Sequence, residues 1–342
     1  MVRYDNLFDK IVTLENFYQA FHDMRLGHKY NKRSMRMSAR IECIITDLIR
    51  ELKDGSWMPG KYYAFECRTE VKRRQIHAPC FRDGLVHHAL DNILRPLFER
   101  KYIYDLYSNR KGKGQHRAVK RVQHFIRKAS HRGRVYVLQC DIHKYYDSID
   151  HDVLKRMLCA TIKDKRVLDV LYKIIDSYNE DTGRGVPIGA LPSQTFANVY
   201  LCELDHFIKE TLRVKSYMRF MDDFILVANG KEELHAWLLE IKWYLQTQVH
   251  LELNPKTQIY PAYRGVDFGG YRIFKDKILP RKRNLKAARI RFKNLSWHFR
   301  QGDICIEDVR PRVMSFLGYC KHCKARRSVE TVLSYLVLSK GR

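Results

Sequence analysis

The stretch that decides the fold runs from Tyr217 to Ala228 and reads Tyr-Met-Arg-Phe-Met-Asp-Asp-Phe-Ile-Leu-Val-Ala. Two apolar runs, 217–221 and 224–228, flank the acidic pair Asp222 and Asp223. Short β-prone runs separated by two turn-forming residues predict a β-hairpin with both acids in its turn. An Asp-Asp turn by itself indicates no chemistry, because Asp is common in turns. Its meaning depends on the surrounding sequence.

Strand and helix patterns alternate on both sides of this hairpin. In chain order they are a β-like run at 134–141, helical periodicity at 150–158, 193–212 and 234–245, and a short β-like run at 251–254. Asp150 and Ser193 stand where N-capping side chains are expected. The order strand, helix, helix, hairpin, helix, strand predicts an α+β fold with an antiparallel sheet of the split βαβ, ferredoxin-like type.

Asp141 ends the first of these strands. In a split βαβ sheet the end of the first strand and the hairpin turn lie side by side, so we expect Asp141 to meet Asp222 and Asp223. Clustered carboxylates repel one another unless a cation neutralises them, and hard divalent cations prefer carboxylate oxygens. Two Mg²⁺ ions about 4 Å apart are a common device for in-line phosphoryl transfer. The three acids therefore predict a phosphoryl-transfer site.

The charge of the chain indicates the class of its partner. Lys and Arg number 64 against 38 Asp and Glu, which gives a formal net charge of +26. An excess of this size is typical of proteins with a polyanionic partner. The segments 101–134 and 272–300 each hold eleven Lys or Arg and one acid. They predict a cleft whose basic walls bind phosphates, with two solvated helix faces as the alternative.

Composition sets the class and the expected location. The chain has 342 residues, of which 45% are hydrophobic, as in globular proteins with a sizeable core. No stretch approaches the ~18 consecutive apolar residues of a membrane span, and residues 1–10 lack the apolar core of a signal peptide. The nine cysteines, an odd number, are typical of reduced thiols, so we expect a cytoplasmic protein that binds no membrane. Cys320 and Cys323 lack a second pair, so we expect no zinc site.

Seven short motifs, in order, resemble those of reverse transcriptases. Residues 220–223 resemble the catalytic (Tyr/Phe)-x-Asp-Asp box, and 141–150 looks like the first catalytic box. The other matching segments are 74–90, 108–119, 188–194, 253–256 and 266–271. This resemblance implies an RNA-directed DNA polymerase, bacterial or phage-encoded, with a right-hand fold. Its parts would be N-terminal helices and fingers at 1–135, a palm at 136–280 with a nucleotide-contacting loop near 186–195, and a basic helical thumb at 281–342.

The resemblance also assigns roles to single residues. Asp141 and Asp222 would ligate two Mg²⁺ ions, which Mn²⁺ can replace, with the Ile142 carbonyl as a further ligand and Asp223 as a ligand or a support. The implied nucleotide-binding residues are Arg74, with Lys72 and Arg73 as alternatives, Tyr146, Ile188, Gly189, Gln194 and Lys256. Tyr146 would exclude a 2′-hydroxyl and Lys256 would act on the pyrophosphate, with core packing and a plain surface position as their alternatives. The implied primer grip is Phe268, Gly269, Gly270 and Tyr271.

Two departures from the common reverse transcriptase motif indicate a subgroup of the family. Most reverse transcriptases have Gln-Gly-x-x-x-Ser-Pro where this chain has Ile188 and Gln194 in the outer positions. That pattern resembles the enzymes of diversity-generating retroelements, which copy a template RNA with frequent errors at adenines. An aliphatic side chain in place of an amide removes a contact that can discriminate between nucleotides. A group II intron-like or antiviral-defence enzyme of ordinary fidelity, and an inactive RNA-binding relative, are the alternatives.

The same resemblance implies the partners. They are the template RNA, the RNA–DNA primer–template duplex, deoxynucleoside triphosphates, and an accessory variability protein that forms a basic barrel.

Overall fold

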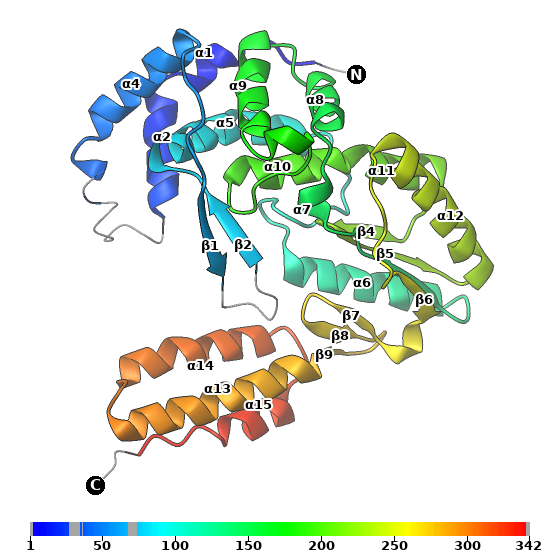
Figure 1. The fold of residues 1–342 in the computed structure, drawn as a ribbon. Helices are drawn as coiled ribbons and strands as arrows, with labels where there is room; N and C mark the ends of the chain where they lie inside the picture. The colour runs from blue at the N-terminus through cyan, green and yellow to red at the C-terminus, as the bar shows by residue number, and fades with distance from the viewer. Residues whose placement is uncertain (1–2, 27–34, 36, 68–73, 340–342) are drawn as a thin grey trace. The chain divides into compact units, whose positions relative to one another are not determined.

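The computed structural model describes residues 3–26, 35, 37–67 and 74–339 (Figure 1). The described chain forms two compact units, each discontinuous in sequence. The first unit comprises residues up to 110 with 141–214 and 239–256, and the second comprises 111–140, 215–238 and 257 onward. No helix among the described residues is both long enough and apolar enough to cross a bilayer.

Helices make up most of the first unit. They are α1 (Phe8–Ile11), α2 (Leu14–Arg25), α4 (Ile41–Lys53), α5 (Phe81–Glu99), α7 (Tyr145–Ser148), α8 (His151–Cys159), α9 (Lys165–Asp176), α10 (Leu191–Tyr200) and α11 (Cys202–His206), with short turns at Glu180–Thr182 and Phe207–Thr211. The helices α1, α2, α4 and α10 all pack against α5. A buried amide reinforces this packing, because Asn16 Nδ2 donates to the carbonyl oxygens of Ile11 and Ala89, both at 2.9 Å.

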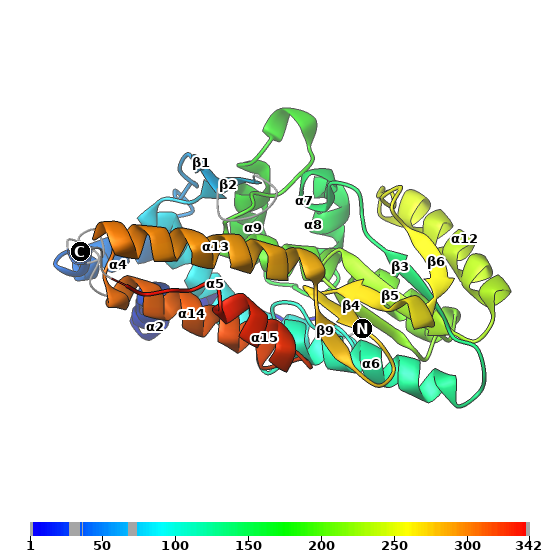
Figure 2. The ribbon, with the colours of Figure 1, turned by 90° about the horizontal axis from the view of Figure 1, so that it is seen from below.

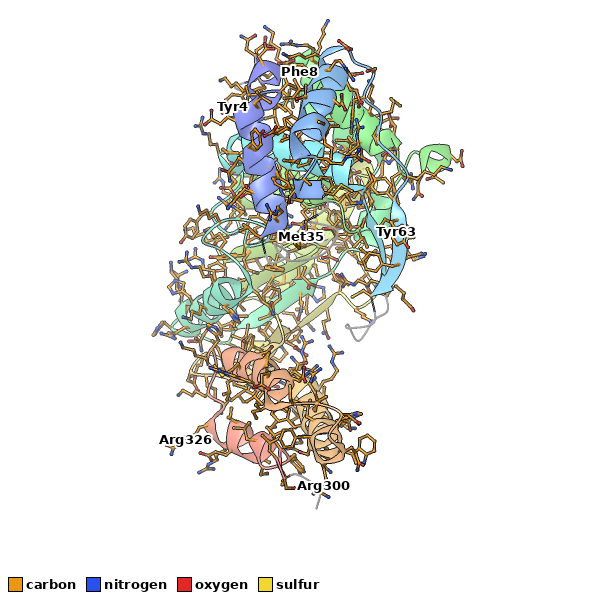
Figure 3. The ribbon with its side chains drawn as sticks, turned by 90° about the vertical axis from the view of Figure 1, so that its left-hand side faces the viewer. Tyr4, Phe8, Met35, Tyr63, Arg300 and Arg326 are labelled. Carbon is orange, nitrogen blue, oxygen red and sulfur yellow. The ribbon has the colours of Figure 1, made fainter. Side chains whose placement is uncertain are left out.

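A two-stranded hairpin also belongs to the first unit. Its strands are β1 (Tyr63–Cys67) and β2 (Arg74–Ala78), paired antiparallel with Cys67 opposite Arg74. The side chain of Tyr63, labelled in Figure 3, is 76% exposed. The hairpin therefore gains little from apolar burial along β1, and its anchoring comes from β2.

A four-stranded antiparallel sheet dominates the second unit. Its strands are β3 (Tyr136–Cys140), β4 (Tyr217–Phe220), β5 (Asp223–Ala228) and β6 (Gln258–Pro261), in the spatial order β4-β5-β3-β6. Helices separate β3 from β4, a hairpin joins β4 to β5, and α12 (Lys231–Gln248) precedes β6. This order and connectivity confirm the predicted ferredoxin-like sheet. The helix α6 (Gln115–Ser130) packs on β4 and β5 (Figure 2).

A small sheet and three helices complete the second unit. The sheet is formed by β7 (Val266–Phe268), β8 (Tyr271–Ile273) and β9 (Ile278–Pro280), and the helices are α13 (Lys282–Gln301), α14 (Ile306–Cys320) and α15 (Arg326–Leu333). The helices share an apolar core in which the rings of Phe292 and Phe316 meet edge to face, with centroids 5.4 Å apart. The outer surface of these helices, away from the shared core, carries exposed cations such as Arg300 and Arg326 (Figure 3). The C-terminal segment is thus the basic helical element expected.

Two local predictions are wrong and one is confirmed. The α8 cap is as predicted, since Asp150 accepts the N–H groups of Asp152 and Val153. Ser193, in contrast, lies buried inside α10, which begins at Leu191. Pro192 lies in the first turn of that helix, where a residue needs no N–H donor, and so favours the earlier start. The predicted strand at 251–254 is only an isolated bridge, and the fourth strand is β6.

Candidate active site

The hairpin β4–β5 carries the two adjacent acids. Phe220 pairs with Asp223, so the loop consists of Met221 and Asp222. The predicted turn at Asp222 and Asp223 was therefore displaced by one residue, and Asp223 is the first residue of β5. Met221 makes the early turn possible by adopting a φ of +58°. Both acids are half-buried.

A buried arginine supports this turn. Arg219 lies in β4 with no exposed surface, and its Nη1 donates to the carbonyl oxygen of Met221 at 3.0 Å. Met221 is in a backbone conformation that non-glycine side chains rarely adopt, so a hydrogen bond to its carbonyl helps to hold it. The sequence alone assigns no role to Arg219. The available signal was a charged residue in the middle of an apolar strand.

Asp141 is held by an asparagine on a neighbouring segment of the first unit. The Nδ2 of Asn254 donates to Asp141 Oδ2 at 3.0 Å, and the Asn254 N–H donates to the Asp141 carbonyl at 2.7 Å. The carboxylate is thereby oriented from one side. In the sequence, Asn254 stands only within the matching segment 253–256, and nothing there indicates this contact.

The residue after Asp141 is buried in a one-residue bridge. Ile142 is 2% exposed and lies opposite Leu253. The hydrogen bonds flanking this bridge use the carbonyls of Asp141 and Glu252. Neither bond uses the Ile142 carbonyl, the atom predicted as a metal ligand.

The loop that holds Ile188 and Gly189 is fastened to β2. The His77 N–H donates to the Ile188 carbonyl at 2.7 Å. Gly189 has a φ of +122°, and a Cβ there would lie 2.7 Å from Cγ2 of Ile76. Glycine at 189 is therefore required for packing within the first unit. The predicted contact of Gly189 with a nucleotide stays a prediction, as does that of Gln194, which is exposed on α10.

The other predicted nucleotide-binding residues lie on several elements of the first unit. Arg74 is exposed at the start of β2, while Lys72 and Arg73 lie outside the described residues. Tyr146 is half-buried on α7, and its carbonyl accepts the Val186 N–H at 2.9 Å. Lys256 is exposed, and its N–H donates to Asn254 Oδ1 at 3.1 Å.

The predicted primer grip is the hairpin β7–β8. Phe268 pairs with Tyr271, and the loop between them is Gly269 and Gly270, with φ values of +56° and +80°. The ring of Phe268 packs edge to face on Phe220, with centroids 6.1 Å apart. This contact joins the glycine hairpin to the hairpin of Asp222 inside the second unit.

The far side of the primer-grip hairpin rests on the C-terminal helices. The Tyr319 hydroxyl donates to the Gly270 carbonyl, and the Tyr271 hydroxyl donates to the Tyr319 carbonyl at 2.8 Å. The two rings stack with centroids 4.8 Å apart. Burial raises the pKa of Tyr271, so its hydroxyl stays protonated and remains a donor across the physiological range.

The described residues contain no preformed cluster of potential metal ligands. No three His, Cys, Asp or Glu side chains of that part of the chain gather around one point. The donor chemistry of Asp141, Asp222 and Asp223 is nevertheless that of a hard-cation site, because carboxylate oxygens are the ligands Mg²⁺ prefers.

A sequence profile described as reverse transcriptase (RNA-dependent DNA polymerase) matches residues 68–273. This span contains both hairpins and Asp141. The chain belongs to the reverse transcriptase family. It is 25% identical over 282 residues to Protein YkfC of Escherichia coli K12, a match covering 70% of this chain and 74% of that one.

A second relative of this reverse transcriptase is the group II intron-encoded protein LtrA of Lactococcus lactis. The two are 24% identical over 301 residues, a match covering 67% of this chain and 49% of LtrA. The chain thus spans about half the length of LtrA. Among solved structures, telomerase from Candida albicans in complex with a fragment of telomeric RNA is similar, with a TM-score of 0.51 and 13% identity, over 87% of this chain and 59% of that one.

These similarities confirm the predicted fold class. The chain is an α+β protein with the right-hand polymerase fold, in which the ferredoxin-like sheet is the palm and the C-terminal helices are the thumb. The similarity at 13% identity supports the fold alone. The sequence limits of fingers, palm and thumb stay a prediction.

Proposed function

We propose that this protein is an RNA-directed DNA polymerase that copies a retroelement template RNA into cDNA by two-metal phosphoryl transfer. The observation that carries the proposal is the family match over residues 68–273, which includes Asp141, Asp222 and Asp223. The register of the palm sheet supports it. Cys140 pairs with Phe224, and these two residues adjoin Asp141 and Asp223 in the sequence.

The metal ligands we propose are the carboxylates of Asp141, Asp222 and Asp223 and the carbonyl of Ile142. Reverse transcriptases generally depend on divalent metal, and two Mg²⁺ ions, or Mn²⁺ in their place, would stabilise the attacking and leaving oxygens of the phosphoryl transfer. Asn254 fits this scheme, because an amide that donates to one carboxylate oxygen of Asp141 orients the other.

For the substrate, we propose that Arg74, with Lys72, grips the triphosphate. A planar guanidinium binds phosphate oxygens through two parallel hydrogen bonds. Tyr146 would exclude the 2′-hydroxyl, Gln194 and Gly189 would contact the nucleotide or template, and Lys256 would act on the pyrophosphate. The primer end would be held by the hairpin of Phe268, Gly269, Gly270 and Tyr271. The contact of Phe268 with Phe220 links this hairpin to the one that carries Asp222.

We further propose that copying is error-prone at adenines and diversifies a target gene. Ile188 supports this proposal, because it offers a hydrocarbon chain where most reverse transcriptases have an amide. Its carbonyl is held by the His77 N–H, so its position in the loop is well determined. Template RNA, primer–template duplex and deoxynucleoside triphosphates would be the partners, together with an accessory basic barrel protein.

The similarity to LtrA favours a second candidate, a group II intron-like or antiviral-defence enzyme of ordinary fidelity. The two candidates differ in what they predict for the product. An error-prone enzyme misincorporates opposite adenine, whereas the second candidate copies all four bases with similar accuracy.

Sequencing the cDNA distinguishes the candidates. Purified protein is mixed with a defined RNA, an annealed primer, Mg²⁺ and deoxynucleoside triphosphates. We expect cDNA whose substitutions concentrate at template adenines, and fewer of them with Ile188→Gln. Uniformly accurate cDNA would support the second candidate. If the wild type yields no more cDNA than Asp222→Asn, the protein is an inactive RNA-binding relative.

A further inference from the structure

A pocket of about 470 Å³ lies within the second unit, at the C-terminal end of α6. Its other walls are the loop at 131–135, the short helical turn Ala262–Arg264 and the turn at 274–277 between β8 and β9. The volume is in the range of small-ligand sites. We call this the α6 pocket.

The α6 pocket is remote from the elements assigned to catalysis. The turn at 274–277 follows the pair Ile273–Ile278, at the opposite end of β8 from Gly269 and Gly270. Arg134 precedes β3, whose other end is Cys140. At about 3.3 Å per residue, roughly 13 Å separate the first and last Cα atoms of that strand.

The lining of the α6 pocket combines cations with an open aromatic ring. Three exposed cations line the pocket, namely Arg134, Lys275 and Lys277. The lining contains a single acid, Asp276. In the described parts of the chain, none of these three cations forms an ion pair with a carboxylate. Tyr263 is 67% exposed, which leaves its ring open to a stacking partner.

The walls of the α6 pocket are fixed by hydrogen bonds. Gln123 Nε2 on α6 donates to the Phe274 carbonyl at 3.1 Å and holds the β8–β9 turn. Asn229 Nδ2 donates to the carbonyls of Ala129 and Arg134, both at 3.0 Å. The Ala262 N–H donates to the carbonyl oxygen of Val135 at 2.9 Å. The backbone segments that carry the cations and the ring are therefore held in place before any ligand arrives.

Phe274 adds a steric constraint on the same wall. A Cβ on Gly265 would lie 2.7 Å from Cζ of Phe274. The ring of Phe274 therefore packs directly on the backbone that carries Tyr263. Lys277 Nζ lies 5.6 Å from the centroid of the Phe274 ring, so the ring also positions a cation at the rim.

We propose that the α6 pocket binds an unpaired nucleotide of a single-stranded nucleic acid, outside the polymerase cleft. The base would stack on Tyr263, and its flanking phosphates would contact Lys275, Lys277 and Arg134. Aromatic side chains beside a basic groove are the general means of holding single strands, since every base offers a π-face. A duplex presents no such face, because its bases are already stacked.

Fluorescence anisotropy on the full chain tests the proposal. The polymerase cleft is first saturated with an unlabelled primer–template duplex, and then a labelled twelve-nucleotide oligo(U) RNA or oligo(dT) DNA is added. We expect a saturable signal, and the two oligonucleotides show which sugar the pocket prefers. Tyr263→Ala should weaken binding about tenfold, as expected for the loss of one stacked base, while Tyr263→Phe should bind as the wild type does.

The salt dependence tests the phosphate contacts. The binding constant of the wild type should decrease with salt concentration. In the double variant Lys275→Gln/Lys277→Gln, the slope of log binding constant against log salt concentration should be less steep by about 1.4, since each single-strand phosphate contact accounts for about 0.7. Lys231→Gln/Lys242→Gln on α12 is the matched control and should leave affinity nearly unchanged. Primer extension on a short template should persist in all four variants, which separates this site from catalysis.

Three results would overturn the proposal. They are the absence of oligonucleotide binding once the cleft is filled, equal affinity for Tyr263→Ala and the wild type, and equal losses in the pocket pair and the α12 pair. Thermal melting shows whether a variant is folded. If Tyr263→Ala fails to fold, Tyr263→Leu, which keeps apolar bulk but cannot stack, replaces it in the same comparison.

Discussion

Two hairpins of the second unit reverse the chain in two residues, but with different side chains. The β7–β8 loop is Gly269 and Gly270, and both have positive φ values. The β4–β5 loop is Met221 and Asp222, and its positive φ falls on a methionine. Glycine accepts that conformation without steric cost, whereas a residue with a Cβ pays about 1–2 kcal/mol.

The difference shows what a carboxylate in a tight turn requires. The glycine turn carries no steric strain at its positive φ values, and the Tyr319 hydroxyl that donates to the Gly270 carbonyl adds to its support. The turn that displays Asp222 keeps a strained residue beside it and has the buried Arg219 bonded to the carbonyl of that residue. Backbone strain retained at one such place is typical of functional sites.

The largest effect, a loss of primer extension, is expected from a substitution of Asp222 in the strained turn. Asp222→Asn preserves shape but removes the charge, so primer extension should fall on the order of a thousandfold, as when a group that stabilises transition-state charge is lost. Single-turnover extension measures it. Asp54→Asn, on the exposed end of α4, is the control and should be neutral. Near-normal extension by Asp222→Asn would exclude this residue from catalysis.

A smaller loss is expected from the support of the strained turn. Arg219→Met should lower kcat by about 10–100-fold and raise the Mg²⁺ concentration needed for half-maximal rate, as mutations beside metal ligands commonly do. Arg219→Lys should recover part of the rate. An unchanged Mg²⁺ dependence, together with a lowered Tm, would reduce Arg219 to a purely structural residue.

The two loops should respond to opposite exchanges with opposite changes in stability. Gly269→Ala should destabilise the protein by about 1–2 kcal/mol, because it adds a Cβ at positive φ. That Cβ would also lie 3.0 Å from Gln115 Cγ. Met221→Gly should stabilise it by about 0.5–1 kcal/mol. Urea unfolding followed by circular dichroism measures both, and a destabilised Met221→Gly would contradict the assignment of strain.

The smallest effect is expected on the stability of the protein at low pH, through a histidine beside the glycine hairpin β7–β8. His116 Nδ1 lies 3.3 Å from the Tyr271 hydroxyl, and the imidazole stacks on His322 at 3.6 Å. Burial, and then His322, lower the pKa of His116 below 6.5. The unfolded state therefore binds protons first as the pH falls, and the stability that neutral His116 contributes is present above about pH 6.5 and lost below it.

His116→Phe tests this linkage. Tm is recorded for the variant and the wild type between about pH 8 and pH 5. We expect a shallower decline for the variant over the acid half of that range, and the same slope for both proteins above about pH 7. Parallel curves throughout would show that His116 titrates alike in the folded and unfolded states.

The sheet could be predicted because its pattern is local. Apolar runs of four to six residues at β3, β4 and β5, separated by helical periodicity, leave few topologies open. The turn register could not be predicted, because nothing in Phe-Met-Asp-Asp signals a methionine at positive φ. The fourth strand was misplaced because, within the described residues, the segment containing Leu253 and Asn254 forms only a one-residue bridge with the backbone that follows β3.

The site was predictable in its acids and not in its supports. Asp141, Asp222 and Asp223 stand in recognisable motifs, whereas Asn254 and Arg219 act through contacts that arise only on folding. Ser193 shows the converse error. It has the residue type of a cap, but Pro192 sets the helix start one turn earlier.

The attachment of the loop at 186–190 to β2 bears on the copying accuracy that we propose Ile188 to influence. Ile188 hangs from the His77 N–H, and Gly189 has no room for any side chain beside Ile76. A bulkier or smaller residue at position 76 would therefore shift the loop that carries Ile188 while residue 188 itself stayed the same. Under the proposed function, a substitution at position 76 of β2 would thus change copying accuracy through the position of the loop, with residue 188 itself unchanged.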